Sequence, residues 1–293
     1  MDRAAGAPVQ AGAFHMGAYL ERIGLTGGSV GIAELHRAHV TAIPFENLDP
    51  HRGVPVSLEP EALARKLIGA RRGGYCFEHN LLLAAGLRDL GAEVQPMLGR
   101  VRLGRGPGVP RPRSHLVLRV VWEDGVWLAD AGFGNGTLLQ PIPFEPDPDR
   151  VHEQSGWRYR LVREGAEHVL EAASPVNATS ASQADSPSHP GGSGWEQLYG
   201  FVPEPVPFID IETSNWYTST HPRSAFVTGL HVCAHRPDGS FVTLSGWPEP
   251  SLSERAPDGG FEQPVALTDV PALLAERFGL PGFRLDERPR RLI

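Results

Sequence analysis

Cysteine is scarce in this chain, whose 293 residues include only Cys76 and Cys233. Two cysteines this far apart in sequence are not expected to form a disulfide in a reducing compartment. They also cannot by themselves make a zinc site of the CxxC type. We therefore expect two free thiols, and the question is whether either has a chemical role.

Long apolar runs are missing as well. No segment approaches the roughly 18 consecutive apolar residues of a membrane-spanning helix. Residues 1–14 lack the apolar core of a signal peptide. We expect a cytoplasmic protein without a membrane partner.

Excess positive charge is the third absence. The formal net charge is −7, and Lys66 is the only lysine, so arginine carries almost all of the basic charge. Proteins that bind nucleic acid without sequence preference depend on an excess of lysine and arginine. Nucleic acid is therefore not an expected partner.

A helical pattern fills the first part of the chain. Apolar residues recur at i, i+3 and i+4 in three segments that end near glycine or proline, residues 16–25, 31–43 and 59–70. A fourth helix is predicted to begin within residues 71–80 and to stop at Gly91, because glycine is common just past a helix end. Residues 1–93 are thus expected to form a helical bundle.

From residue 94 the apolar period changes towards 2, which indicates strands. The predicted strands are residues 94–101, 114–122, 126–133, 157–165 and 167–174. The second and third flank Asp124-Gly125, a tight-turn pair, so an antiparallel sheet or barrel is expected. Residues 174–194 are almost all small, polar, proline or glycine and are expected to form a flexible surface loop.

The C-terminal part mixes both patterns. Residues 226–235 and 239–246 are predicted to pair as a hairpin, and residues 270–279 are predicted to form a helix. With helices first, strands next and both at the end, the sequence indicates the α+β class.

Cys76 lies in the stretch RRGGYCFEHN, residues 71–80, at the start of the fourth predicted helix. A cysteine in the first turn of a helix faces exposed N–H groups and the positive end of the helix dipole. Both lower the pKa of a thiol and favour the nucleophilic thiolate. Arg71 and Arg72 add positive charge there and are expected to position or tune the site. The alternative is that Cys76 is a small buried core residue.

A cysteine nucleophile needs a base, usually histidine, and the base needs an orienting group. Among twelve histidines, His115 opens a strongly alternating strand, where its ring can be held in place. Asp130 follows across the predicted turn, so the two are expected to be cross-strand neighbours. A buried carboxylate is costly without a partner, and a histidine ring supplies one. The alternative is that Asp130 caps the turn that follows it.

Two further patterns leave alternatives open. The glycine-rich run at residues 132–136 can bring backbone N–H groups close to a phosphate, or it can form an ordinary turn. His231, Cys233 and His235 alternate on a predicted strand and so share one face. A metal site is conceivable there, but no fourth ligand is apparent and no metal is expected.

Five segments together resemble the successive motifs of the arylamine N-acetyltransferase family. They occur in the family's order and are IPFENLD (43–49), RRGGYCFEHN (71–80), SHLVLRV (114–120), LADAGFG (128–134) and IDIETSNWYTST (209–220). The resemblance implies an N-terminal helical bundle (1–93), a central antiparallel β-barrel (94–200) and a C-terminal α/β lid (201–293). It also implies a papain-like Cys-His-Asp core.

The resemblance also implies roles for single residues. Cys76 is the acyl-accepting nucleophile, His115 is its base and Asp130 orients His115. Gly132 and Gly134 contact coenzyme A, and three aromatic residues line the acceptor pocket, Phe45, Phe133 and Phe201. Taken singly, aromatic residues of this kind more often belong to a core. Glu46 and Asn47 are expected to hold the loop behind the active helix.

The implied reaction is a ping-pong acyl transfer without a metal. An acyl group passes from the co-substrate acetyl-CoA, or a related acyl-CoA, to Cys76. It passes on to the nitrogen of an arylamine, a hydrazine or an arylhydroxylamine.

Three rival functions are consistent with the same residues. An amide synthase would take a polyketide chain from an acyl carrier protein and join it to an aromatic amine. A cysteine hydrolase or transglutaminase-like enzyme would release free acid or cleave peptides without needing an amine. A non-catalytic binding module would tolerate Cys76→Ser without loss of function.

Overall fold

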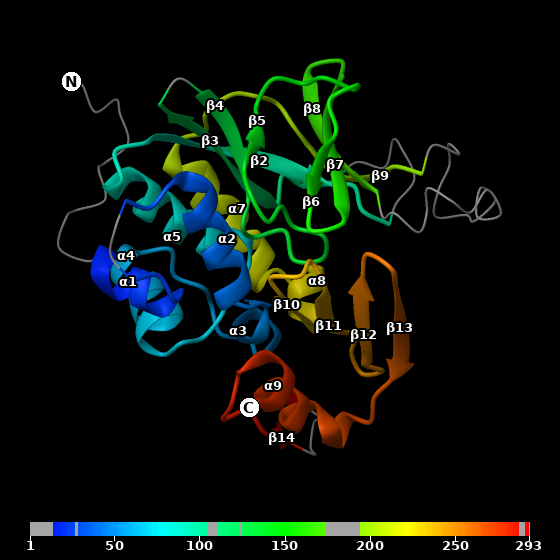
Figure 1. Cartoon of the computed structure of the whole chain (residues 1–293). Helices are drawn as coiled ribbons and strands as arrows, with labels where there is room; N and C mark the ends of the chain where they lie inside the picture. The colour runs from blue at the N-terminus through cyan, green and yellow to red at the C-terminus, as the bar shows by residue number, and fades with distance from the viewer. Residues whose placement is uncertain are drawn as a thin grey trace.

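The computed structural model describes residues 14–26, 29–104, 111–123, 125–173, 194–286 and 291–292. The loop predicted at residues 174–194 lies outside these ranges except for Gly194, and Asp124 of the predicted turn lies outside them as well. In Figure 1 the N-terminal helices, blue to cyan, lie beside the green eight-stranded sheet. The orange and red C-terminal segments lie at the bottom of the same view.

The predicted N-terminal helices are present, with one difference. Their bounds are α1 (Met16–Arg22), α2 (Ile32–Ala42), α4 (Pro60–Leu63) and α5 (Cys76–Asp89). A short helix that was not predicted, α3 (Leu48–His51), lies between α2 and α4 in the chain. The helix predicted over residues 59–70 consists of α4 followed directly by a π-helical turn, η1 (Ala64–Gly69). Proline at the first position of α4 fits there because its missing N–H has no intrahelical partner at a helix start.

Helix α5 packs against α2 and against strands β2 (Glu93–Val101) and β3 (His115–Trp122). Leu83 and Leu87 on α5 are almost fully buried, and burial of such side chains stabilises the fold by about 1.5–3 kcal/mol each. The helix ends as predicted at Gly91, whose φ of 95° lies in the left-handed region that glycine adopts readily.

The predicted antiparallel sheet has eight strands in the order β5-β4-β3-β2-β9-β8-β7-β6. Their bounds are β2 (Glu93–Val101), β3 (His115–Trp122), β4 (Gly125–Ala129), β5 (Ile142–Pro143), β6 (His152–Gln154), β7 (Trp157–Glu164), β8 (Glu167–Ala173) and β9 (Glu196–Phe201). The Gln154 side chain on β6 accepts from the backbone N–H groups of Leu139 and Gln140, just before β5. These bonds join the two edges, so the sheet forms a nearly closed barrel.

The C-terminal region contains helices α7 (Phe208–Thr220), α8 (Ala225–Thr228) and α9 (Val270–Phe278). Its sheet has the order β1-β10-β11-β12-β13, with bounds β1 (Phe45–Glu46), β10 (His231–His235), β11 (Phe241–Ser245), β12 (Ser251–Ala256) and β13 (Gly259–Pro264). The short elements η3 (Leu267–Asp269), β14 (Leu285–Asp286) and β15 (Arg291–Leu292) complete it. Because β1 comes from the N-terminal region and pairs with β10, this sheet joins the two ends of the chain. The boundaries at residues 93 and 200 stay predictions.

The prediction of a strand from residue 226 was wrong for its first half. Residues 225–228 form α8, and the strand begins only at His231. The Ser224 hydroxyl accepts a hydrogen bond from the Phe226 N–H and caps this turn of helix. A serine cap of this kind outweighs the strand preference of the apolar residues that follow it.

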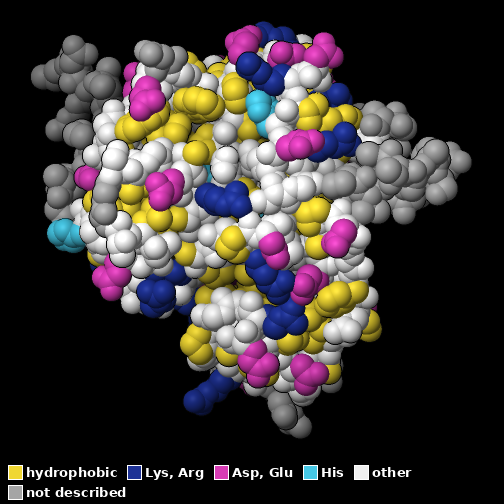
Figure 2. Space-filling view, in the orientation of Figure 1, with side chains coloured by type: hydrophobic (Ala, Val, Ile, Leu, Met, Phe, Trp, Pro, Cys, Tyr) yellow, Lys and Arg dark blue, Asp and Glu magenta, His cyan; other side chains and the backbone are white. Residues whose placement is uncertain are grey.

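The surface gives no sign of a single-charge patch on the side seen in Figure 2, where acidic and basic side chains are interspersed. No helix among the described residues has both the length and the apolar character needed to span a bilayer.

The contact between Gly86 on α5 and Tyr19 on α1 generates a stability prediction. A Cβ at position 86 would lie 2.5 Å from Cε1 of the fully buried Tyr19 ring, whose hydroxyl is held by His39. Gly86→Ala is therefore expected to destabilise the protein by about 1–3 kcal/mol despite the better helix propensity of alanine. Urea unfolding measures the loss. Gly17→Ala, at an exposed position of α1 with open space around it, is the control and should not destabilise. Equal stability of both variants would contradict the packing described here.

Candidate active site

Cys76 is the first residue of α5, so its thiol lies at the helix N-terminus as predicted. The first-turn N–H groups of a helix lack intrahelical partners and carry the positive end of its dipole. The sulfur lies 3.5 Å from the Ser114 carbonyl oxygen, immediately before β3. Cys76 is only 2% exposed, so the thiol is shielded from solvent in this structure.

His115 and Asp130 form the expected cross-strand pair. His115 opens β3 and Asp130 directly follows β4, and His115 Nε2 lies 2.8 Å from Asp130 Oδ2. The β3–β4 register pairs Leu118 with Ala129, so its continuation places Asp130 diagonally across from His115. Both side chains are buried, so bulk water does not compete for this contact.

The charges of His115 and Asp130 stabilise each other. Burial alone would lower the pKa of His115. The charge and hydrogen bond of Asp130, followed by the hydrogen bond and charge of Cys76, instead raise it to about 10. Burial alone would raise the pKa of Asp130, but His115 and hydrogen bonds from Asn80 and Gly132 lower it. The arrangement therefore favours an ionised Asp130 beside a protonated imidazole at His115.

Asn80 is a site residue that sequence reasoning left unassigned. It lies four residues after Cys76 on α5, and its amide contacts both Asp130 and the backbone beside His115. Tyr199 on β9 was also missed, and its ring lies 4.6 Å from the His115 ring. Burial and then the charge of Asp130 raise the pKa of Tyr199 well above its usual range. No sequence pattern linked either residue to Cys76, His115 and Asp130, which we call the triad, because their partners are distant in the chain.

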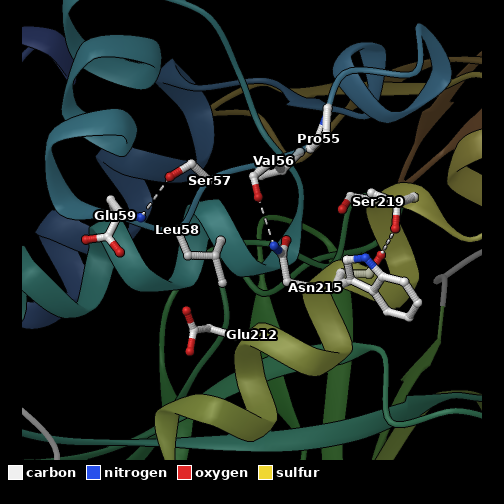
Figure 3. Close-up of a pocket in the computed structure, with 10 residues that line it drawn as sticks. Pro55, Val56, Ser57, Leu58, Glu59, Glu212, Asn215 and Ser219 are labelled. Carbon is white, nitrogen blue, oxygen red and sulfur yellow. Dashed lines mark hydrogen bonds between the residues drawn. The ribbon is translucent and has the colours of Figure 1, made fainter.

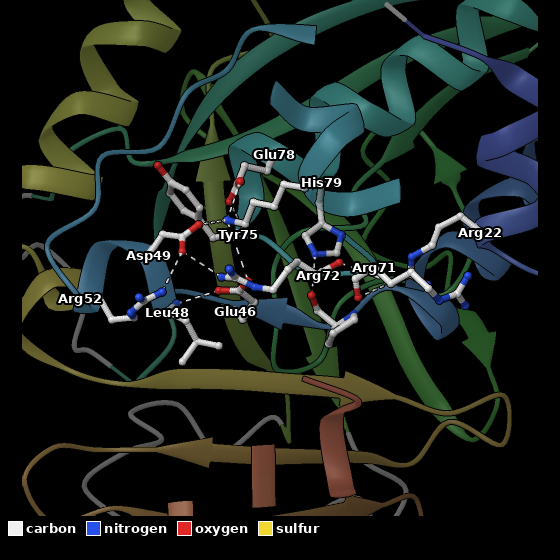
Figure 4. A network of polar contacts seen from close by, with 12 residues as sticks. Arg22, Glu46, Leu48, Asp49, Arg52, Arg71, Arg72, Tyr75, Glu78 and His79 are labelled. Carbon is white, nitrogen blue, oxygen red and sulfur yellow. Dashed lines mark hydrogen bonds and ion pairs between the residues drawn. The ribbon is translucent and has the colours of Figure 1, made fainter. Parts of the chain in front are cut away.

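The start of α5 is held by a cluster of charges shown in Figure 4. Glu78 accepts from the Tyr75 N–H at 3.1 Å, and Lys66 Nζ donates to Glu78 at 2.8 Å. Lys66 also pairs with Asp49 at 2.7 Å. Burial raises the pKa of Glu78 to about 7 against the opposing effect of Lys66. The only lysine of the chain thus fixes the cap of the helix that carries Cys76.

Arg72 and Glu46 belong to the same cluster, and Asn47 makes separate contacts behind it. Arg72 donates to Glu46 Oε1 and Asp49 Oδ1 at 2.6 and 3.0 Å. Asn47 bonds to the backbone of residues 226–231 and so fixes the chain that crosses behind the loop. Arg71 has an exposed side chain, so the structure gives it no comparable role.

The predicted glycine loop passes close to the nucleophile helix. A Cβ on Gly132 would lie 2.7 Å from the Cys76 Cα, so only glycine permits this approach. The Gly132 N–H donates to Asp130 Oδ1 at 2.9 Å and therefore serves Asp130 in this structure. Gly134 has a φ of 84°, and its carbonyl oxygen accepts from His235 Nε2 at 2.7 Å.

Comparison with known proteins decides the family. A family model described as N-acetyltransferase matches residues 31–282. An arylamine N-acetyltransferase of Mycolicibacterium smegmatis is 44% identical over 237 residues, which are 78% of this chain and 79% of that protein. An arylamine N-acetyltransferase of Mycobacterium tuberculosis is 37% identical over 287 residues, covering 94% and 93% of the two chains. The chain belongs to the arylamine N-acetyltransferase family.

Solved structures agree with this assignment. The structure of the Mycobacterium marinum arylamine N-acetyltransferase in complex with CoA matches with a TM-score of 0.78 and 34% identity. It covers 91% of this chain and 93% of that one. The predicted α+β class, with its helical bundle, β-barrel and C-terminal α/β region, is thereby confirmed as the arylamine N-acetyltransferase fold.

Two of the three aromatic residues predicted to line the acceptor pocket lie near His115 and Cys76. The Phe133 ring lies 5.2 Å from the His115 ring, and Phe45 belongs to the same apolar cluster as Cys76. Phe201 lies in the barrel core, where its ring contacts Phe144 and His168. Its role as an acceptor contact stays a prediction.

On the alternating face of His231, Cys233 and His235, one residue bonds to the glycine loop. His235 bonds to Gly134, and burial raises the pKa of Cys233 to about 12. Within the described ranges, no group of three or more His, Cys, Asp or Glu side chains is arranged to hold a metal ion.

A cavity of about 290 Å³ lies between residues 55–59 and α7, and Figure 3 shows its lining. The Asn215 Nδ2 group donates to the Val56 carbonyl oxygen at 2.9 Å, and the Tyr75 hydroxyl donates to Asn215 Oδ1. The cavity is thus linked to the residue before Cys76. Cys76 itself does not line the cavity, so the cavity does not include the candidate nucleophile.

Buried histidines behind the triad generate a pH prediction. Burial lowers the pKa of His36 and His79 to about 4, and it lowers that of His39 as well. The unfolded chain binds protons at these rings near pH 6.5. Their contribution to stability is therefore present above pH 6.5 and is lost as the pH falls below it. For His36 and His79 the loss is about 2 kcal/mol per ring near pH 5.

Urea unfolding near pH 7 and near pH 5 measures this loss. His36→Gln should reduce the pH dependence of the unfolding free energy, because it removes one of the buried rings. The same unfolding free energy at both pH values in the wild type would show that these rings are not held neutral.

Proposed function

We propose that this family member transfers the acetyl group of acetyl-CoA to the nitrogen of an arylamine through a thioester on Cys76. The observation that carries the proposal is the buried Cys76, His115 and Asp130 set in a chain of the arylamine N-acetyltransferase family. Hydrazines and arylhydroxylamines offer the same kind of nucleophilic nitrogen and belong to the proposed acceptor class. We place the reaction in the cytoplasm, where a reducing medium keeps both cysteines as thiols.

In the first half-reaction, the Cys76 thiolate attacks the thioester carbonyl of acetyl-CoA. A carbon–sulfur bond forms to Cys76 and the bond to the coenzyme sulfur breaks. The departing coenzyme thiolate takes a proton from the His115 imidazolium, which leaves His115 neutral. One thioester replaces another, so the step has little thermodynamic cost.

In the second half-reaction, the amine nitrogen attacks the acetyl carbon on Cys76. Neutral His115 accepts a proton from the nitrogen, and the bond to the Cys76 sulfur breaks to release the amide. The thiolate and the imidazolium are thereby restored. Asp130 keeps the His115 ring oriented and stabilises its positive charge in both half-reactions.

Oxyanion stabilisation is assigned to the backbone N–H groups of Cys76 and Phe77 at the start of α5. These groups lack intrahelical acceptors and lie beside the sulfur. They are therefore suited to a negative charge that develops on the carbonyl oxygen.

Substrate contacts are assigned by position. Coenzyme A is supported as the donor by the complex of the M. marinum relative with CoA. We assign Gly132 and Gly134 to the loop that approaches the coenzyme. Phe45 and Phe133 supply the apolar side of the acceptor site, because aromatic rings pack favourably on one another.

Intact-mass measurement tests the proposal. Acetyl-CoA is expected to add the mass of one acetyl group to the wild type, and addition of an arylamine should remove it. Propionyl- and malonyl-CoA define the range of donors. Cys76→Ala should lose the adduct, and His115→Ala should form it much more slowly because the thiolate loses its ion-pair partner.

The second cysteine provides the matched control. Cys233→Ala, also at a buried position, should keep both the adduct and its discharge. No adduct with any donor would refute the proposal, and an adduct that is discharged only to water would favour a hydrolase.

A further inference from the structure

The Asn80 amide makes three hydrogen bonds, one to strand β3 and two to the segment that directly follows β4. Nδ2 donates to the Leu116 carbonyl oxygen at 2.6 Å and to Asp130 Oδ1 at 2.8 Å. Oδ1 accepts from the Ala131 N–H at 2.9 Å. Because Nδ2 faces two acceptors and Oδ1 faces a donor, only one orientation of the amide fits.

The position of Asn80 on α5 relates these bonds to the nucleophile. Residues four apart lie on the same face of a helix, so Asn80 stands one turn below Cys76. Leu116 is the neighbour of His115 on β3, and Ala131 is the neighbour of Asp130 after β4. One fully buried side chain thus ties the helix of the thiol to the strand ends of both other groups.

The surroundings of Asp130 leave its carboxylate dependent on few donors. Oδ1 accepts from Asn80 and from the Gly132 N–H at 2.9 Å, and Oδ2 faces His115. Tyr199 and the buried rings of His36 and His79 are the other titratable groups that interact electrostatically with this carboxylate. Loss of a donor in a buried site weakens the ionised form of a carboxyl group.

We infer that Asn80 is a positioning residue of the acyl transfer, because its amide holds the Asp130 carboxylate and the His115 strand in register with Cys76. The inference rests on the proposed function, in which His115 and Asp130 sustain the thiolate. Asn80 touches no reacting atom and acts through Asp130.

The test is the pH profile of Cys76 alkylation by iodoacetamide, which reports how readily the thiolate forms. Asn80→Ala removes the donor to Asp130, so His115 loses part of its support. The pH at which the alkylation rate is half-maximal should rise by about one unit. Asn80→Leu fills the same volume without the amide and should show the same shift, which keeps the test available if the alanine variant does not fold.

Asn47 provides a matched control of the same residue type. Its side chain is also fully buried and also makes three hydrogen bonds, to Phe226, Gly229 and His231, but it does not contact the triad. Asn47→Ala should lower the melting temperature about as much as Asn80→Ala and leave the alkylation profile in place. An equal shift in both asparagine variants would mean that general loosening moves the profile and would overturn the inference.

A double-mutant cycle shows whether Asn80 acts through Asp130. Asp130→Asn alone should raise the half-maximal pH further than Asn80→Ala does. Asn80→Ala in the Asp130→Asn background should then add little, because the carboxylate it supports is gone. Full additivity of the two shifts would overturn the assignment.

The test of Asn80 and the test of the proposed function can fail independently of each other. The acetyl adduct on the wild type tests the transferase reaction, whereas alkylation needs no acetyl-CoA. A wild type that forms the adduct, together with a folded Asn80→Ala that titrates like the wild type, would refute the inference alone.

Discussion

The ion pair between Asp130 and His115 is the contact on which the rest of the site depends. A buried carboxylate is expensive unless its charge is balanced and its oxygens are hydrogen-bonded. Here His115, the Asn80 amide and the Gly132 N–H supply this balance. The ionised Asp130 keeps His115 protonated, and the proposed mechanism uses the protonated ring as the partner of the Cys76 thiolate. Without the pair, Cys76 would be a shielded thiol in an apolar cluster.

The fold brings this pair to Cys76 from two directions. The β3–β4 hairpin sets the spacing of His115 and Asp130 through its register, and α5 carries Cys76 against the open end of that hairpin. The helix start is fixed from outside the barrel by Lys66 and Glu78. Single glycines permit the closest approaches, since Gly132 lies against the Cys76 backbone. The relative positions of Cys76, His115 and Asp130 thus depend on packing between separate regions of the chain.

The sequence alone was sufficient to predict the parts that depend on local pattern. Helix periodicity predicted the start of α5 at Cys76, and the alternating strands with their turn brought His115 and Asp130 together. The prediction of a strand from residue 226 was wrong because the Ser224 side chain caps a short helix, α8, at these residues. Asn80 could not be assigned because its partners, Leu116, Asp130 and Ala131, become its neighbours only in the folded chain.

The protonation state of His115 tests the central claim most directly. Nitrogen NMR of histidine-labelled protein, with the His115 signals assigned from their loss in His115→Ala, follows both ring nitrogens against pH. The account predicts that His115 keeps both ring protons through neutral pH and loses one only as the pH approaches about 10. Titration of His115 near pH 6.5, as for a free histidine side chain, would contradict it.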